Sequence, residues 1–508
     1  MSRSSKSPIR DFNRGLDQTV GILLAVWVVF APWAFGSTAG WSAWTTTFLA
    51  YAVGIVSLAR RISWRCFSFR EPRWNSPGRG NAWSRALAVI AVLFVGYVGL
   101  SILNARARVI WNNEGFDFDY RDFQSWLPTT YDVDATTRAF VRYIGLALGF
   151  WGARDWLLGM TRGERHRAED GRLQHEPGRV PGRLKALLWT FAVSTALMSL
   201  VGMLHRLDGS RDLLWIRKVR MNTSTGMFGP FPYRANAAQY LNLVWPLVLG
   251  FWWILRREAK RTLGPNLRIG GGPHVLLLPC AAVMLVGTMV AASRGGIMVA
   301  GIELALVVGV LAISGRRQAG IGWFLAGGLA LVLATGWLLA GDFLQKRFQA
   351  RDEYVGLHGR AAIYAGAHRI ADDFPVFGTG AESFMAISGL YREKPSGDWP
   401  AYVHDDWLET RVTFGWVGLA AVLAMLALVP LIHWRHGVLP VPREFRAMLA
   451  IAMGGMLLHA VFDFPFQILS LHCAFLVVAA IATVLSPLPE SASSDDSVAE
   501  GILGKRNA

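Results

Sequence analysis

Long apolar blocks dominate this chain of 508 residues and constrain its fold more than any other feature. Each block is roughly 18–22 residues long, the length of helix that crosses the hydrocarbon layer of a bilayer. Only 17% of the residues are charged, whereas soluble domains hold about a quarter. We therefore predict an all-α, polytopic membrane protein. Its twelve predicted spans are residues 19–36, 41–59, 84–103, 138–158, 185–205, 236–255, 274–292, 295–314, 320–341, 413–433, 447–465 and 466–487.

Basic segments lie before the first predicted span and after the second, fourth, sixth, eighth and tenth. They are residues 1–18 and the loops at 60–83, 159–184, 256–268, 316–317 and 435–446. If the spans alternate in direction, all of these segments lie on one side, which the positive-inside rule assigns to the cytoplasm. Both termini are then cytoplasmic. The net charge of +16 thus fits membrane topology, and nucleic acid is not predicted as a partner.

The predicted organisation has four parts. Residues 1–341 hold the first nine spans and short loops, and residues 342–412 form a large, partly helical exoplasmic loop that carries catalytic residues. Residues 413–487 hold the last three spans. The Ser/Asp-rich tail, 488–508, is predicted to be disordered and cytoplasmic.

Two exoplasmic loops are basic, against the charge rule. Candidate substrate-binding residues among their cations are Arg217, Lys218, Arg220 and Arg411. Cations on the disfavoured side indicate an anionic ligand there, such as a phosphate or pyrophosphate. The alternative is that loops of this length translocate regardless of charge.

Two further arginines are candidate phosphate ligands. Arg294 lies between two apolar runs, next to glycines that allow close backbone approach. It would clamp a phosphate with its planar fork, or else snorkel to the interface. Arg360 opens a predicted loop helix and would grip the same ligand; the alternative is a solvated surface arginine.

A cluster of titratable residues follows, just before the predicted span at 413. It contains His404, Asp405, Asp406 and Glu409. A histidine beside a carboxylate is the usual group that takes a proton from a hydroxyl near neutral pH. The acids would orient this base, bind the acceptor or cap the next helix. A metal site is the rival interpretation, but no recognised metal spacing is present, so no metal or cofactor is predicted.

Polar residues also lie inside or beside the spans. His459 and Asp463 form an i, i+4 pair that would either support the site or satisfy each other within the bundle. Asn236 begins another span as a cap or a weak substrate contact. Glu303 lies within a span and would pair with an arginine; its role is otherwise unassigned.

These pieces together resemble the O-antigen ligase and polymerase superfamily of bacterial inner-membrane proteins. The likeness is strongest from about residue 226 to residue 487 and depends on the order of several motifs. The motifs are Gly226-x-Phe228 before Asn236, Ser293-Arg294-Gly295, Arg360 followed by Phe374-Pro375-x-x-Gly378-x-Gly380 and Phe384, the His404 box, and His459 to Pro465.

The resemblance implies a GT-C-like glycosyltransferase of cell-envelope polysaccharide or lipopolysaccharide biosynthesis. Its site would be periplasmic and metal-independent, and its donor a glycan on undecaprenyl diphosphate. Its acceptor would be another glycan or a lipid-linked core. Arg294 and Arg360 look like the arginines that hold the diphosphate, and His404 like the histidine that activates or orients the acceptor hydroxyl. The chain departs from the family pattern at Asp405, where asparagine is usual, and at Thr413, where glutamate is usual.

A polytopic transporter or flippase for a lipid-linked saccharide is the competing hypothesis. Such a protein is expected to show internal repeats and polar sites near the midplane of the membrane. The sequence shows no such repeat, and its polar residues gather at one predicted face. The enzyme is therefore the favoured interpretation.

Overall fold

The computed structural model describes most of the chain. The described residues are 8–67, 73–74, 82–112, 115–170, 180–219, 226–263, 272–315, short pieces between 327 and 345, 357–391, 401–436 and 438–487. Arg220, the predicted tail at 488–508 and most of the predicted span at 320–341 lie outside them.

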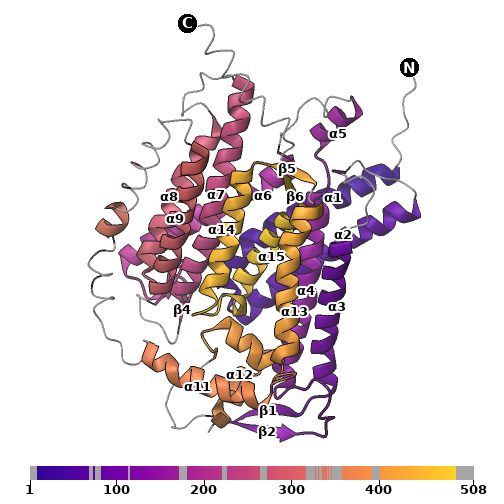
Figure 1. The fold of residues 1–508 in the computed structure, drawn as a ribbon, viewed down its shortest axis with the longest axis vertical. Coiled ribbons are helices and arrows are strands. Elements are labelled where there is room, and N and C mark those ends of the chain that lie inside the picture. The colour runs from indigo at the N-terminus through magenta and orange to yellow at the C-terminus, as the bar shows by residue number, and fades with distance from the viewer. Residues whose placement is uncertain are drawn as a thin grey trace.

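The described chain is a bundle of long helices (Figure 1). The helices of the bundle are α1 (Pro8–Trp33), α2 (Gly40–Cys66), α3 (Ala82–Leu103), α4 (Val133–Leu157), α6 (Gly182–Asp208), α7 (Arg234–Leu263), α8 (Leu277–Ala291), α9 (Arg294–Gly315), α13 (Asp406–His436), α14 (Arg443–His459) and α15 (Leu469–Val484). Each of them overlaps one of the predicted spans, and some are shorter: α14, for example, ends at His459 and not at residue 465. Eight of the helices in the described part are long and apolar enough to cross a membrane, which supports an all-α membrane protein.

Short elements connect and cap the bundle. They are η1 (Phe35–Ser37), β1 (Ala107–Asn112), β2 (Gly115–Tyr120), α5 (Arg162–Glu169), β3 (Asp212–Leu213), β4 (Arg217–Lys218), η3 (Pro273–Leu276), α11 (Leu357–Asp373), α12 (Phe384–Ile387), η4 (Ser388–Tyr391), β5 (Leu439–Val441), η5 (Pro465–Gln467) and β6 (Leu485–Pro487). The strands form three two-stranded pairs: antiparallel β1–β2 and β3–β4, and parallel β5–β6.

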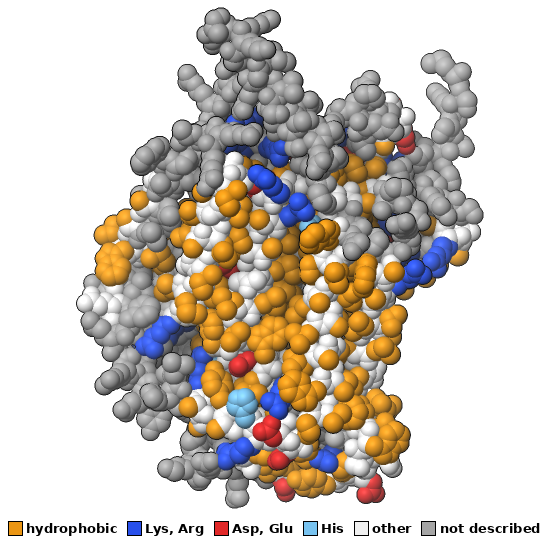
Figure 2. Space-filling model, in the orientation of Figure 1, with side chains coloured by type: hydrophobic (Ala, Val, Ile, Leu, Met, Phe, Trp, Pro, Cys, Tyr) orange, Lys and Arg blue, Asp and Glu red, His pale blue; other side chains and the backbone are white. Residues whose placement is uncertain are grey.

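Burial divides the helices into a centre and a rim. Most of α7 is buried, and so is almost the whole of α15. By contrast, less than a third of the apolar span in each of α3, α9 and α13 is buried. Figure 2 shows the corresponding band of hydrophobic side chains across the middle of one face, with charged side chains gathered toward its two ends. Exposed apolar surface of this extent is expected where lipid, not water, surrounds the helices.

Small residues let two of the helices come close. A Cβ atom at Gly54 of α2 would lie 2.4 Å from the Cβ of Leu148 in α4, and one at Gly152 of α4 would lie 2.8 Å from Cγ1 of Val53. Because lipid tails are as apolar as the helix surfaces, close packing at small residues is a main source of helix association in membranes.

The two ends of the bundle differ. The first turns of α1, together with α5, β5 and β6, lie at one end, and α11, α12 and the β1–β2 hairpin lie at the other (Figure 1). We call the second group the end cap. Its core joins Ala367, Ile370 and Ala371 of α11 to Val403, Leu408 and Val412. The predicted loop and the first turns of the chain thus lie at opposite ends.

Backbone hydrogen bonds fasten the end cap to the bundle. The amide of Thr379 donates to the carbonyl of Val412 at 3.0 Å, and the amide of Gly380 donates to that of Thr413 at 2.9 Å. Gly378 takes a φ of +67° to make this turn. The helix α13 begins at Asp406, seven residues before the predicted span, so Asp406 and Glu409 lie within it.

Replacing Gly378 with alanine is expected to destabilise the protein. A left-handed backbone costs a residue with a Cβ atom about 1–2 kcal/mol, and this Cβ would lie 2.5 Å from the amide nitrogen of Phe414. We expect a lower midpoint of thermal unfolding for the purified protein in detergent.

The matched control is Gly366→Ala within α11. Its Cβ would meet nothing closer than the Tyr391 carbonyl oxygen, at 3.8 Å, and alanine is favoured over glycine inside a helix by about 1 kcal/mol. Its midpoint should stay unchanged or rise. Equal midpoints for the two variants would contradict a strained, tightly packed turn at Gly378.

Candidate functional site

The side chain of His404 lies between the end cap and the bundle. Its Nδ1 is 3.3 Å from Oδ1 of Asp463, and its ring meets that of Phe464 edge-on at 4.7 Å. The backbone of His404 is left-handed, with a φ of +64°. Its side chain remains 26% exposed, while that of Asp463 is only 5% exposed. The histidine is therefore oriented by a buried carboxylate and still accessible from outside.

The turn that follows α14 carries the partners of His404. We call residues 459–468 the α14–α15 turn. Within it, the amide of Phe464 donates to Oδ1 of Asp463 at 3.2 Å, and Pro465 begins the 3-10 helix η5. α14 ends at His459, and Pro465 lies at the start of η5, where its missing amide hydrogen leaves no helical hydrogen bond unmade.

Arg360 reaches the same turn from α11. Its Nη1 donates to the carbonyl of Phe462. One helical turn later, the hydroxyl of Tyr364 donates to the carbonyl of His404 at 3.1 Å. Burial raises the pKa of that hydroxyl, and Arg360 opposes part of the shift. Side chains four residues apart on one helix face thus contact both the turn and His404.

Arg294 is the first residue of α9 and also lies beside this turn. It is exposed, and Ser293 caps the helix by accepting a hydrogen bond from the amide of Gly296 at 3.2 Å. The next residue, Gly295, packs against the turn: its Cβ would lie 2.5 Å from the ring of Phe462 and 3.1 Å from Nε2 of His459. The start of α9, the first turn of α11 and His404 therefore all border the α14–α15 turn.

His459 and Asp463 do not pair with each other as one predicted alternative required. Asp463 faces His404 instead. His459 is buried against the ring of Phe462, at 5.0 Å, and neither of its ring nitrogens has a hydrogen-bond partner among the described residues. A neutral imidazole can be buried in this way at a lower cost than a charged one.

The three acids that follow His404 bind backbone. Asp405 caps α13, because its Oδ1 accepts from the amides of Trp407 at 2.9 Å and Leu408 at 3.0 Å. Burial raises the pKa of Asp405, and these two hydrogen bonds oppose the shift.

Asp406 and Glu409 are almost fully buried in α13. Asp406 accepts from the amide of Phe466 at 2.8 Å and from the side chain of Gln467 at 3.0 Å. Glu409 accepts from the amide of Val403 at 2.9 Å. One carboxylate thus holds the α14–α15 turn, and the other holds the residue before His404. Thr413 donates its hydroxyl to the carbonyl of Glu409 at 2.7 Å.

The capping role of Asp405 predicts a difference between two variants. Asp405→Ala should lower the free energy of unfolding by about 1 kcal/mol, because the cap is lost. Asp405→Asn should match the wild type, since asparagine caps as well as aspartate does. Thermal unfolding of the purified variants measures both. A loss of stability in the asparagine variant as large as in the alanine variant would contradict the capping role.

Other predicted residues are not brought to the α14–α15 turn. Arg411 donates to Asp372 at 2.7 Å and lies over the ring of Trp416 at 4.8 Å, so it braces α13 against α11 on the surface. Arg217 lies over the ring of Phe35 at 5.0 Å, and Lys218 is exposed. Both belong to the β3–β4 hairpin.

Two polar residues lie inside the bundle. Asn236 is buried in α7, and its Oδ1 has no partner among the described residues. Glu303 was expected to pair with an arginine, and that expectation is wrong. Its Oε2 instead accepts from Nε1 of Trp245 at 2.9 Å, because the neighbouring helix presents an indole and not a guanidinium.

An aromatic stack at the site is not among the sequence predictions. Phe464 lies parallel to Tyr402 at 4.6 Å and to Tyr233 at 5.5 Å, in addition to its edge contact with His404. Aromatic residues are common at membrane interfaces, so the sequence holds no signal that separates these three from the rest.

Two further arginines lie near the start of α9. Arg206 donates to the carbonyls of Met227 at 3.1 Å and Ala291 at 3.5 Å, and it lies close enough to Arg234 for their charges to repel. Ala291 precedes Arg294 by three residues. Cations from three helices therefore gather at this end of α8 and α9, where an anionic group would reduce their repulsion.

Nowhere in the described ranges is a group of three or more His, Cys, Asp or Glu residues placed to hold a metal ion. The described geometry offers an oriented histidine and arginines at one turn, which suits the transfer of a group from an anionic leaving group to a hydroxyl.

Residues 279–423 match the family model described as O-Antigen ligase. The matched segment runs from α8 into α13 and contains Arg294, Arg360 and His404, but it ends before Asp463. It covers less than a third of the chain. No curated protein matches the chain significantly.

Proposed function

We propose that this protein, whose residues 279–423 match the family model of O-antigen ligases, transfers or polymerises a glycan carried on undecaprenyl diphosphate. One observation carries the proposal. His404, the backbone contact of Arg360 and the start of α9 all meet at the α14–α15 turn, at the end of a membrane bundle. The lipid-linked donor would approach this end from the bilayer, and the acceptor from the aqueous side.

In the proposed reaction, an acceptor hydroxyl oxygen bonds to the anomeric carbon of the donor sugar. The bond between that carbon and the diphosphate oxygen breaks, and undecaprenyl diphosphate leaves with the electron pair. The hydroxyl proton passes to His404. Because attack and departure take place on opposite faces of the sugar, the anomeric configuration inverts.

Asp463 supports the role of His404 as the base. With its proton on Nδ1, His404 donates to the Asp463 carboxylate, and Nε2 is left as the acceptor for the hydroxyl proton. The carboxylate also stabilises the imidazolium that forms, while the edge contact with Phe464 holds the plane of the ring.

Arg294 and Arg360 would bind the diphosphate. Guanidinium groups bind phosphate oxygens in pairs and stay charged at any working pH. Negative charge develops on the diphosphate oxygen as the bond to the sugar breaks, and nearby positive charge stabilises that transition state. Both side chains come from helix starts next to the same turn, so one lipid diphosphate could contact both.

Substitutions at these residues should abolish glycan transfer. His404→Ala should lower the rate by about 10²–10⁴-fold, as expected for loss of a general base. Arg294→Gln and Arg360→Gln should each lower it by about 10²–10³-fold, as for loss of a group that stabilises developing charge. The assay follows transfer from a lipid-linked donor by the purified protein.

His166→Ala in α5 and Arg85→Gln in α3 are the matched controls, since both side chains are exposed and lie apart from the α14–α15 turn. They should transfer normally. Normal transfer by His404→Ala and Arg294→Gln would overturn the proposed roles, provided that all variants insert in the membrane equally.

Chelation should leave the proposed activity unchanged, because arginines and not a divalent ion would bind the diphosphate. Purified protein treated with EDTA should transfer glycan at the untreated rate. A loss of more than about tenfold that Mg²⁺ or Mn²⁺ restores would instead indicate a metal-dependent leaving group.

We propose a bacterial inner-membrane location with a periplasmic site and cytoplasmic termini.

The glycans of a deletion strain should distinguish the two forms of the proposed reaction, polymerisation and ligation. Loss of a polymerase should leave single repeats on the carrier lipid, and loss of a ligase should leave full polymers on it. Lipid-linked glycan that accumulates only on the cytoplasmic face would instead indicate a flippase.

A further inference from the structure

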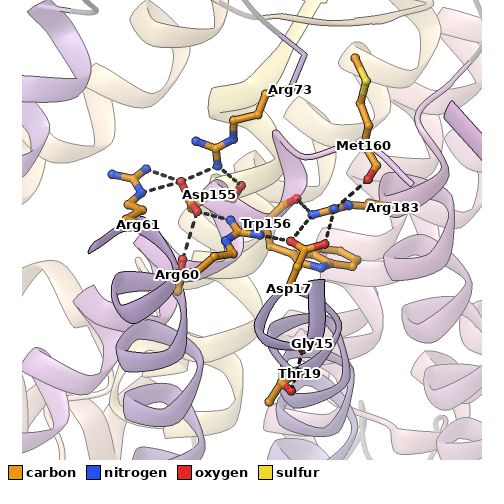
Figure 3. Close-up of polar contacts among 11 residues, drawn as sticks. Gly15, Asp17, Thr19, Arg60, Arg61, Arg73, Asp155, Trp156, Met160 and Arg183 are labelled. Atoms are coloured by element: carbon orange, nitrogen blue, oxygen red, sulfur yellow. Dashed lines mark hydrogen bonds and ion pairs between the residues drawn. The ribbon is translucent and has the colours of Figure 1, made fainter. Parts of the chain in front are cut away.

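A second charged cluster lies at the other end of the bundle, far from His404. Figure 3 shows arginines from several segments around two buried aspartates. Asp17 of α1 accepts from Arg60 of α2 and from Arg183 of α6, in the latter case from Nη1 at 2.9 Å. Asp155 of α4 accepts from Arg60, from Nε of Arg61 at 2.7 Å and from Nη2 of Arg73 at 2.6 Å.

The cations of this basic cluster outnumber its anions. Four arginines share the two carboxylates. Arg154 adds a fifth guanidinium, whose charge is repelled by those of Arg61 and Arg73 and attracted by that of Asp155. The Nη2 of Arg154 donates to the neutral hydroxyl of Ser84 at 3.1 Å. Among the described residues, the ion pairs of the cluster involve no carboxylates other than Asp17 and Asp155. Within the described part of the chain, five guanidinium groups thus face two carboxylates, an excess of three positive charges.

Several buried N–H groups in the basic cluster also have no acceptor among the residues that the structure describes. They are Nε of Arg60, of Arg73 and of Arg154, and Nε1 of Trp64. Arg60 and Arg73 lie over the Trp64 ring, each at 4.8 Å, and the side chain of Arg60 is only 1% exposed. A buried donor that has lost water and gained no partner is costly, and an excess of buried charge more so.

One edge of the basic cluster is open to the surface. Arg61 is 47% exposed. Beside it on α2, Leu58 and Ile62 are each more than half exposed, and Trp83 of α3 is 41% exposed. Apolar side chains that point outward next to an open cationic site fit acyl chains below a headgroup.

We propose that the basic cluster binds the phosphate headgroup of an anionic phospholipid. The phosphodiester oxygens would accept from the donors that lack acceptors and would offset the excess positive charge. The acyl chains would lie along the exposed apolar face of α2 and α3. This site is independent of the proposed glycan transfer, because it lies at the opposite end of the bundle and uses other helices.

The test is a lipid titration of the full-length protein in neutral detergent. Phosphatidylglycerol should raise the midpoint of thermal unfolding until it saturates. Phosphatidylcholine and inorganic phosphate at equal concentrations should have little effect. An equal rise with inorganic phosphate would overturn the proposal in favour of a free-anion site, and an equal rise with phosphatidylcholine would overturn headgroup recognition altogether.

Arg154→Gln tests the cluster itself. It removes one guanidinium but breaks no ion pair, so it should weaken phosphatidylglycerol binding about fivefold, the usual effect of one cation near a lipid surface. Arg65→Gln, at an exposed arginine in the last turn of α2, is the matched control and should change binding less than twofold. An equal loss of phosphatidylglycerol affinity in the two variants would overturn the proposal, because it would show that general surface charge and not this cluster attracts the lipid.

Stability without lipid separates binding from a purely structural role. In lipid-free detergent, Arg154→Gln should unfold at the wild-type midpoint or above it, because a repulsive charge is removed. A lower midpoint would mean that the cluster only braces the helices. Trp64→Phe provides a second variant: it removes one unpartnered N–H and keeps a ring beneath the arginines, so it should weaken phosphatidylglycerol binding and leave lipid-free stability unchanged.

Discussion

The buried carboxylate of Asp406 holds together the segments on which the candidate site depends. It joins the start of α13 to the α14–α15 turn through the amide of Phe466 and the side chain of Gln467. Asp463, the partner of His404, lies in that turn, which also receives Arg360 and packs against the start of α9. Carboxylates that accept hydrogen bonds in a buried place are rigid anchors, so a single acid fixes the frame in which the exposed groups meet.

The sequence predicted the features that leave a local pattern. Apolar blocks of membrane length predicted the long described helices, and Arg294 could be placed at a helix start because apolar runs flank it on both sides. The partners of His404 could not be placed, since Asp463 lies 59 residues further along the chain. The same holds for Asp17 and Arg183, which are 166 residues apart. Such pairings depend on which helices pack together, and spacing in the sequence does not encode that directly.

The buried acids at the two ends of the bundle have different hydrogen-bond partners. At the candidate site, Asp405, Asp406 and Glu409 accept hydrogen bonds from backbone amides and from the side chain of Gln467, while Arg360 donates to a carbonyl of the turn. At the basic cluster, Asp17 and Asp155 bind the arginines directly and leave an excess. The first arrangement suits a substrate that binds and dissociates in each turnover, and the second suits a lipid that stays bound.

The segment that matches the family ends within α13, whereas the α14–α15 turn begins 36 residues later. A fragment cut in the loop between α13 and α14 would keep Arg294, Arg360 and His404 yet lose the surface that brings them together. The segment that matches the family model therefore lacks part of the chain that assembles the site. Fragments, fusions and chimaeras of this protein would need boundaries drawn after α15 to inherit a complete one.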